Sequence, residues 1–233
     1  MANLAWLTAR PIAHRGLHDA TAGLIENTAS AFAAAIAGNY GIETDLQISA
    51  DGEAMVHHDD ALGRLTEGSG KLAEMSAAAI QKVRFKASAD MILTLEDLCE
   101  LVGGRATLVL ELKSRFDGDL RLAQRAAQVL ADYAGPVAVM SFDPALVEAI
   151  RRLALGLTRG IVAERMPPFG SLLRARPQFV AYSVKNLPAL APLVARWVFG
   201  LPLLTWTVRS EEDRRRAEYW ADQAIFEGVA PQT

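Results

Sequence analysis

The chain has 233 residues, of which 51% are hydrophobic and 22% are charged, and its formal net charge is -3. This length suits a single α/β barrel, and the composition excludes a disordered chain and a strongly basic nucleic-acid-binding protein. Cys99 is the single cysteine, so an intramolecular disulfide is impossible and a thiolate zinc site is not expected.

The first residues lack a charged start followed by a long apolar stretch, so they do not read as a signal peptide. No uncharged apolar run of about 18 residues occurs, which predicts that no helix spans a membrane. No basic amphipathic segment stands out that would bind a membrane surface. We therefore expect a cytoplasmic protein without nucleic-acid partners and without stable membrane association, and the sequence leaves its oligomeric state open.

Short apolar runs alternate with helical stretches rich in Ala, Leu and Arg. The first predicted helix has Asn27 or Thr28 as its N-cap and ends at Gly38. The predicted strands span residues 11–14, 41–49, 107–112, 137–141, 160–163, 178–183, 203–208 and 224–226. The predicted helices span residues 27–38, 94–102, 119–133, 144–155, 169–176, 187–199 and 210–221.

A less regular stretch follows the second strand. Residues 54–58 are predicted to be extended, and residues 59–90 contain three glycines and a short helical piece over 76–85. We interpret residues 59–90, approximately, as an insertion over one rim of the fold.

Eight strands without an alternating polar face, separated by helices, indicate a parallel sheet that is buried on both sides. At this length the pattern predicts an α/β protein with one domain over residues 1–233, a (β/α)₈ TIM barrel with a small insertion after strand two. The alternative is an open doubly wound sheet. Neither a Gly-x-Gly-x-x-Gly turn after the first strand nor a Gly-x4-Gly-Lys-Ser/Thr loop occurs, which disfavours it.

Three acidic residues lie where the functional groups of such a barrel gather, at the carboxyl ends of its strands. Glu43 and Asp45 are two residues apart on one strand and point to the same side, and Glu111 lies at the corresponding end of the next. Converging carboxylates repel one another, and either protonation or a divalent cation relieves the repulsion. Oxygen ligands suit Mg²⁺, Ca²⁺ or Mn²⁺. Alternatively, the acids are solvated or pair with Lys113 and Arg15.

Histidines near the same rim add groups that exchange protons near neutral pH. His14 ends the first strand and is followed by Arg15, whose planar guanidinium suits phosphate, and by Gly16, which permits a tight turn. His58 lies near this rim, whereas alternation along an extended segment turns His57 away. Two histidines, a metal and an arginine are what phosphodiester cleavage requires.

Other residues admit two interpretations. Lys113 either neutralises phosphate or pairs with Glu111, and the face that it shares with Glu111 favours phosphate. Trp206 is either a wall for a small substrate or part of the core. Asn27 and Thr28 are expected to be helix caps rather than ligands.

The chain resembles the glycerophosphodiester phosphodiesterases, whose short motifs recur here in the family order over nearly the whole length. These motifs are His14-Arg15-Gly16, Glu26-Asn27-Thr28, Ala31-Phe32, Glu43-Thr44-Asp45, His58-Asp59, Leu62-Gly63-Arg64, Thr94-Leu95-Glu96-Asp97, Glu111-Leu112-Lys113, Ser141-Phe142-Asp143 and Trp206-Thr207-Val208.

The resemblance implies hydrolysis of a small-molecule glycerophosphodiester to an alcohol and glycerol 3-phosphate. In the family a glycerol hydroxyl attacks phosphorus first, and water then opens the cyclic phosphate. The implied roles are metal ligands at Glu43, Asp45 and Glu111 for Mg²⁺ or Ca²⁺, an acid/base pair at His14 and His58, and phosphate contacts from Arg15 and Lys113.

Several positions depart from the family pattern. Leu65 replaces the first threonine of Arg-Thr-Thr, and Leu93 replaces the proline of Ile-Pro. Arg209 stands where an asparagine is common, and Glu227 stands near the place of an aspartate that precedes a proline. None of these changes removes a catalytic group, and the last two bear on the choice of alcohol.

Two other functions remain open. One is a phospholipase D or C relative that acts on lipid phosphodiesters, which requires an apolar rim or a membrane-docking surface. The other is a non-catalytic barrel that binds phosphate compounds, which the intact histidines and acids disfavour.

Overall fold

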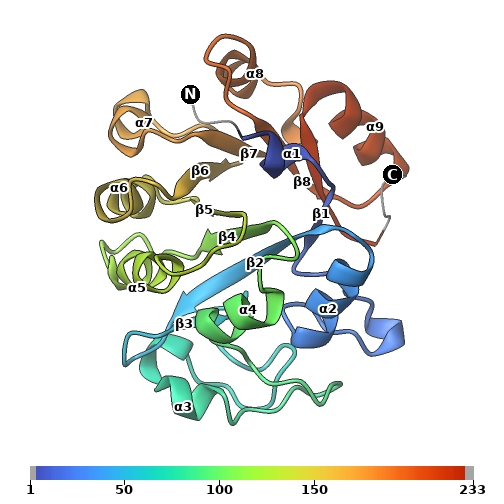
Figure 1. Cartoon of the computed structure of the whole chain (residues 1–233), viewed down its shortest axis with the longest axis vertical. Coiled ribbons are helices and arrows are strands. Elements are labelled where there is room, and N and C mark those ends of the chain that lie inside the picture. Colours follow the sequence, from blue (N-terminus) through green and yellow to red (C-terminus); the bar gives the residue numbers. More distant parts are fainter. Residues whose placement is uncertain (1–3, 229–233) are drawn as a thin grey trace.

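Eight parallel strands close into a barrel in the computed structural model, which describes residues 4–228 (Figure 1). The strands are β1 Ile12–His14, β2 Gly41–Ile48, β4 Leu108–Leu112, β5 Val137–Ser141, β6 Thr158–Ala163, β7 Phe179–Ser183, β8 Leu203–Val208 and β9 Gln223–Phe226. They neighbour one another in that order, and β1 pairs with both β2 and β9. β3, Ala54–Val56, pairs antiparallel with β2. The predicted TIM barrel is confirmed.

Helices connect the strands and cover the outside of the barrel, and Figure 1 shows α5, α6 and α7 stacked along one side. The α-helices are α1 Ala5–Thr8, α2 Ala29–Ala37, α3 Ala77–Ile80, α4 Leu95–Val102, α5 Arg121–Leu130, α6 Pro144–Leu153, α7 Phe169–Ala175, α8 Leu190–Trp197 and α9 Glu211–Trp220. Short 3₁₀ helices are η1 Ala20–Ala22, η2 Leu72–Glu74 and η3 Val184–Asn186.

Two predicted helices are shorter than the sequence pattern indicated. Residues 187–199 form a helix only from Leu190, because proline restricts the backbone of the residue before it and Pro188 follows Leu187. The helix predicted over 76–85 is confined to α3, because Phe85 instead forms a β-bridge with Thr66. In both places a tertiary or proline constraint overrides the local helical preference.

Apolar side chains fill the inside of the barrel, so it is a packed core and not a channel. Phe179 is fully buried there, and its ring occupies the space beside Gly160. A Cβ at Gly160 would lie 2.4 Å from that ring, so the neighbouring strand must carry glycine at this point. Leu7 of α1 joins the same cluster near the amino ends of the strands.

The stretch between β3 and α4, which Figure 1 shows around α3 at its foot, supplies most of a small apolar cluster that also includes Ile25 and Met55. Leu72, Ile80 and Phe85 are buried in it, and two β-bridges tie the stretch together. The boundaries of the insertion, and the assignment of residues 1–233 to one domain, stay predictions. Among the described residues, no helix is both long and apolar enough to cross a membrane.

Candidate active site

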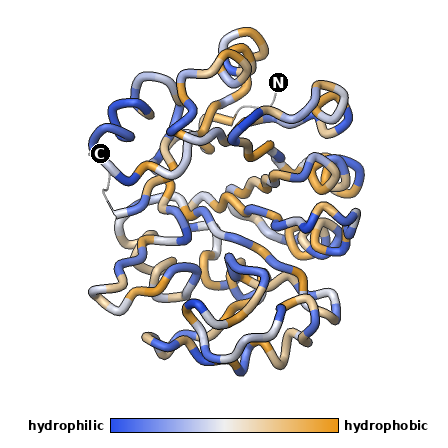
Figure 2. The backbone as a smooth tube through the Cα atoms, turned by 180° about the vertical axis from the view of Figure 1, so that it is seen from behind, coloured by the Kyte–Doolittle hydropathy of each residue, from blue (hydrophilic) through white to orange (hydrophobic). Residues whose placement is uncertain are grey.

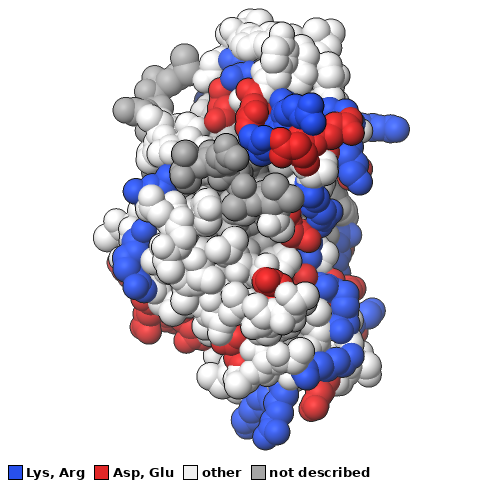
Figure 3. Space-filling view, turned by 90° about the vertical axis from the view of Figure 1, so that its right-hand side faces the viewer, with Lys and Arg blue, Asp and Glu red and all other residues white. Residues whose placement is uncertain are grey.

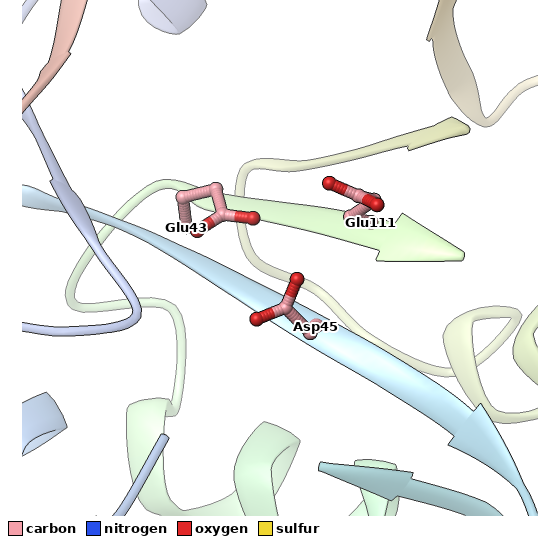
Figure 4. A group of neighbouring side chains, drawn as sticks. All are labelled: Glu43, Asp45 and Glu111. Atoms are coloured by element: carbon pink, nitrogen blue, oxygen red, sulfur yellow. The ribbon is translucent and has the colours of Figure 1, made fainter. Parts of the chain in front are cut away.

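Three carboxylates converge at the carboxyl ends of two neighbouring strands. Glu43 and Asp45 project from β2 and Glu111 from β4, all toward the same space (Figure 4). Asp45 and Glu111 are direct partners in the strand register, and each of the three residues has a carboxylate oxygen within 4.8 Å of the others. The predicted alternation along β2 therefore brings the three acids together.

Two cations compensate these acids only in part. Lys113 Nζ lies 2.8 Å from Asp45 Oδ1 and 2.6 Å from Glu111 Oε1. Arg15 Nε lies 3.3 Å from Asp45 Oδ2 and is buried without a hydrogen bond. The alternative in which Lys113 and Arg15 pair with the acids is thus partly realised, but three carboxylates still face two cations.

Burial makes this excess of negative charge costly. It raises the pKa of Glu43 well above its ordinary value, and the charges of Asp45 and Glu111 add to the effect. Burial also raises the pKa of Glu111 to about 6, although Lys113 opposes the shift. Burial opposes ionisation of Asp45 too, but Lys113 and Arg15 outweigh it and hold the pKa of Asp45 below its usual range.

The turn after β1 places His14 and Arg15 at this cluster. Arg15 has a positive φ of 58°, and its backbone N–H donates to Glu43 Oε2 over 3.1 Å. Gly16 follows at φ 81°, and a Cβ there would lie 2.9 Å from the Ala31 backbone. Glycine is therefore required where the chain passes the first turn of α2.

Both predicted acid/base histidines are held by a carboxylate through the same ring nitrogen. His14 Nδ1 lies 2.9 Å from Glu227 Oε2, and His58 Nδ1 lies 2.7 Å from Asp59 Oδ1. Because an ionised carboxylate only accepts hydrogen bonds, Nδ1 carries the proton in each ring and Nε2 is left to act. Burial lowers the pKa of His14, although the bond to Glu227 opposes this shift.

A cavity of about 220 Å³ brings the predicted site residues together. Its lining includes all eight of them: His14, Arg15, Glu43, Asp45, His58, Glu111, Lys113 and Trp206. His57 lies outside this lining, and its Nδ1 is 2.8 Å from the Asp59 carbonyl oxygen. The two adjacent histidines thus have different surroundings, although β3 ends at Val56 and the extended segment predicted over residues 54–58 does not continue as a strand to His58.

Apolar side chains form the remaining wall of the cavity. Trp206 packs edge-on against Phe142 with ring centroids 5.5 Å apart, and its Nε1 donates to the Ala181 carbonyl. Trp206 thus packs against the barrel core and also lines the cavity, and its role as a wall for a small substrate stays a prediction.

Two residues support the site through contacts that the sequence did not predict. Glu227 follows β9 and holds His14, and the departure of this position from the family pattern was its only signal. Asn27 was expected to cap a helix, but Thr28 is the N-cap of α2. Asn27 instead takes a positive φ of 57° and donates to Asp45 Oδ2 over 3.0 Å, which fixes a candidate metal ligand.

A barrel with carboxylates, histidines and cations at the carboxyl ends of its strands has the groups needed to hydrolyse a phosphoric ester. Residues 14–230 match the sequence profile of the glycerophosphoryl diester phosphodiesterase family. The chain belongs to this family and is a phosphoric diester hydrolase.

Individual relatives match most of the length of the chain. A glycerophosphodiester phosphodiesterase of Caldanaerobacter subterraneus is 29% identical over 222 residues, which cover 88% of each chain. A solved phosphodiesterase of Oleispira antarctica, in complex with the product sn-glycerol-3-phosphate, has a TM-score of 0.82 at 21% identity and covers 95% of this chain and 94% of its own. A glycerophosphodiester phosphodiesterase of Thermotoga maritima has a TM-score of 0.74 at 21% identity, with 92% of each chain covered. These two structures support the fold.

Proposed function

We propose that the chain hydrolyses small glycerophosphodiesters to an alcohol and glycerol 3-phosphate, with a divalent metal and two histidines. The observation that carries the proposal is one cavity lined by three buried carboxylates and by two histidines that are each held at Nδ1 by a carboxylate. The product bound to the Oleispira antarctica relative is consistent with this substrate class. Because glycerophosphodiesters are deacylated phospholipids, the activity would belong to lipid and glycerol metabolism, and we propose a cytoplasmic location.

The residues present fit a hard cation such as Mg²⁺ or Ca²⁺. Ligands of one Ca²⁺ at about 2.3–2.6 Å are at most about 5 Å apart, and the oxygens of Glu43, Asp45 and Glu111 meet this limit. Burial and the neighbouring charges of Asp45 and Glu111 raise the pKa of Glu43 although Lys113 and Arg15 oppose the shift, which supports a site that a further positive charge would stabilise. When bound, the cation would stabilise negative charge on the phosphoryl oxygens.

Arg15 and Lys113 would bind the phosphate. Each side chain lines the cavity and is less than a quarter exposed, so little water competes for its donors. The planar fork of Arg15 matches two phosphate oxygens, and the Lys113 ammonium adds a compact charge. Both groups are already held in place by Asp45.

The histidines would move the protons. In the first step His14 Nε2 takes the proton of a glycerol hydroxyl while that oxygen attacks phosphorus, and His58 protonates the departing alcohol oxygen. In the second step water opens the cyclic phosphate, and the histidines exchange roles. His58 takes one proton of the water while its oxygen attacks phosphorus, the bond from phosphorus to the glycerol oxygen breaks, and His14 returns its proton to that oxygen. The oxygen and the other proton of the water stay on glycerol 3-phosphate, so His14 is again neutral and His58 again protonated.

The test measures glycerol 3-phosphate released from glycerophosphocholine, with and without EDTA and with Mg²⁺ or Ca²⁺ restored. We expect turnover that EDTA abolishes and one of the two metals restores. Turnover of intact phospholipid alone would favour the alternative of a phospholipase D or C relative, and turnover of neither substrate would favour a non-catalytic barrel. Full activity in EDTA would remove the metal from the proposal.

A further inference from the structure

The helices α7 and α8 leave an apolar groove on the side of the barrel. Its volume is about 1010 Å³, and its lining includes Val180 of β7 between Leu172 and Leu173 of α7 and Val194 of α8. Six of the twelve large hydrophobic side chains that are exposed in the described chain lie between Phe169 and Phe199. Phe169 is 68% exposed and Leu190 is 81% exposed, which is unusual for side chains that share one face.

Figures 2 and 3 show that α8 and α9 differ in hydropathy and in surface charge. In Figure 2 the top of the molecule, where α8 lies, is mostly orange, whereas α9 beside it is blue. In Figure 3 acidic and basic side chains mix over α9, whereas the top of the molecule is white. α9 is thus a solvated helix with paired charges, and α8 presents a face without them.

A second cavity, of about 820 Å³, lies near the amino ends of β6, β7 and β8 and is lined by three arginines. Arg159 is only 8% exposed and donates to the Ala175 carbonyl and to Gln178 Oε1, not to a carboxylate. Arg176 is exposed, and no carboxylate pairs with it within residues 4–228. Arg196 alone of the three is neutralised, by Asp222 at 2.7 Å.

The sequence around these arginines is rich in positive charge. Residues 165–210 contain six cations and no acid, in a chain whose net charge is -3. Of these six, Arg174 pairs with Glu148, Arg196 with Asp222 and Arg209 with Glu227. For Arg165 and Lys185, as for Arg176, the described part of the chain supplies no such partner.

The apolar groove and the arginine cavity are continuous, because Arg176, Pro177 and Leu201 line both. An anionic group at Arg159 and Arg176 would therefore lie directly beside the apolar groove. A ligand that is charged at one end and apolar at the other matches this combination, and a phospholipid with an anionic headgroup is such a ligand.

The apolar groove between α7 and α8 and the adjoining arginine cavity together form what we call the α7–α8 face. We propose that this face docks on an anionic phospholipid surface. A headgroup phosphate would lie at Arg159 and Arg176, and apolar side chains such as Leu173 and Phe199 would lie in the lipid. A second copy of this chain fits less well, because pairing two such faces would oppose their cations. Nucleic acid fits less well because the groove is apolar. Sequence analysis predicted no stable membrane association, because these residues come from separate elements and form no single amphipathic segment.

This docking leaves the candidate active site facing water. The arginine cavity lies at the amino ends of the strands, and the carboxylates lie at their carboxyl ends, on the opposite side of the barrel. The proposal thus concerns the location of the protein and not its chemistry. Docking and turnover can be measured separately.

The experiment is flotation of the full chain with vesicles of phosphatidylglycerol and phosphatidylcholine, compared with pure phosphatidylcholine, in EDTA and without substrate. We expect binding to the anionic vesicles only, weakened by salt. Since a cation near such a surface contributes about fivefold to partitioning, Arg176→Glu should lower it roughly 25-fold. Leu173→Asp should lower it as well, and both variants should keep wild-type turnover of glycerophosphocholine.

Two matched variants control for overall charge and apolar content. Lys82→Glu makes the same charge change as Arg176→Glu, and Met91→Asp removes an exposed apolar side chain as Leu173→Asp does, both in the stretch between β3 and α4. Both controls should bind vesicles like the wild type.

Three results would overturn the proposal: no binding to anionic vesicles, equal losses in Arg176→Glu and Lys82→Glu, or equal losses in Leu173→Asp and Met91→Asp. A stable dimer in ultracentrifugation that Leu173→Asp dissociates would assign the face to a second copy instead. If the wild-type chain binds anionic vesicles but does not hydrolyse glycerophosphocholine, only the proposed hydrolysis is contradicted.

Discussion

Glu227 Oε2 lies 2.9 Å from His14 Nδ1 and 2.7 Å from Arg209 Nη2, so one carboxylate joins the end of β9 to the end of β1 and to the rim. The bonds from His14 and Arg209 hold the pKa of Glu227 below its usual range, despite partial burial. An ionised Glu227 fixes the proton of His14 on Nδ1 and leaves Nε2, 3.9 Å from Glu43 Oε2, at the cavity.

Glu227→Gln should therefore impair turnover without removing a group that touches the substrate. The amide can still accept the Nδ1 proton, but it does not stabilise a positively charged imidazole. We expect kcat to fall roughly 10- to 100-fold, as for the carboxylates that orient metal-binding imidazoles, with a smaller change in KM. Glu53→Gln, which removes a carboxylate from an ion pair with Arg125, is the control and should keep full activity. An unchanged kcat in Glu227→Gln would contradict the positioning role.

Metal affinity should depend on pH through the raised pKa of about 6 of Glu111. A protonated carboxyl does not bind the cation, so affinity for Mg²⁺ or Ca²⁺ should rise from pH 5 to 7 as Glu111 loses its proton. Glu43, whose pKa is also raised by burial, should add to the rise where it ionises. Calorimetry at several pH values, in buffers of different ionisation enthalpy, would also detect the proton released on binding. An affinity independent of pH over this range would contradict the direction of the shift.

The same site predicts the effect of removing one ligand. Glu111→Gln keeps the shape of the side chain but removes an anionic oxygen. Both metal affinity and turnover should fall by at least about tenfold, because even residues that only support a ligand contribute that much. If Glu111→Gln keeps full affinity and activity, the three-carboxylate site is wrong. Glu96→Gln, at an exposed position on α4, serves as the control.

The barrel and the acidic cluster were predictable because each depends on a local pattern. Alternation along β2 puts Glu43 and Asp45 on one side, and parallel pairing with β4 brings Glu111 beside them. Two helix starts were also predictable: Thr28, one of the two predicted caps, is the N-cap of α2, and the helix predicted from residue 94 has Thr94 as its N-cap, since a cap is a contact between neighbours in sequence.

The supporting contacts were not predictable, because they join distant parts of the chain. Glu227 is 213 residues from His14, and only closure of the barrel between β9 and β1 brings them together. Asn27 is a common cap residue, but its positive φ turns the side chain to Asp45. The α7–α8 face could not be predicted for the same reason, since Arg159 on β6 and Arg176 at the end of α7 come to one cavity only in the folded chain.

The adjacent histidines should differ sharply in their importance. His58→Ala should lose roughly 10²–10⁴-fold in kcat, because it removes a candidate general acid or base from the cavity. His57→Ala should lose far less activity, although its buried ring contributes to stability. Thermal unfolding of both variants separates the two effects. Equal losses in kcat for two folded variants would mean that His57 also enters the site.

The roles of His14 and His58 can be separated by the leaving group. If His14 is the base for the attacking glycerol hydroxyl, His14→Ala should slow every substrate alike. If His58 is the acid, its loss should matter least where the departing oxygen needs no proton, because an acid helps only where negative charge accumulates in the transition state. A nitrophenolate leaves with little help, whereas the alkoxide of choline requires protonation.

His58→Ala should therefore keep much more of its relative activity on a glycerophospho-nitrophenol than on glycerophosphocholine, while His14→Ala should be impaired on both. The comparison uses ratios within each variant, so a general loss of folded protein or of metal cancels. The symmetric geometry, with each ring held at Nδ1 by a carboxylate, gives both histidines the means to act as acid or base. If the good leaving group rescues His14→Ala and not His58→Ala, the two roles are reversed.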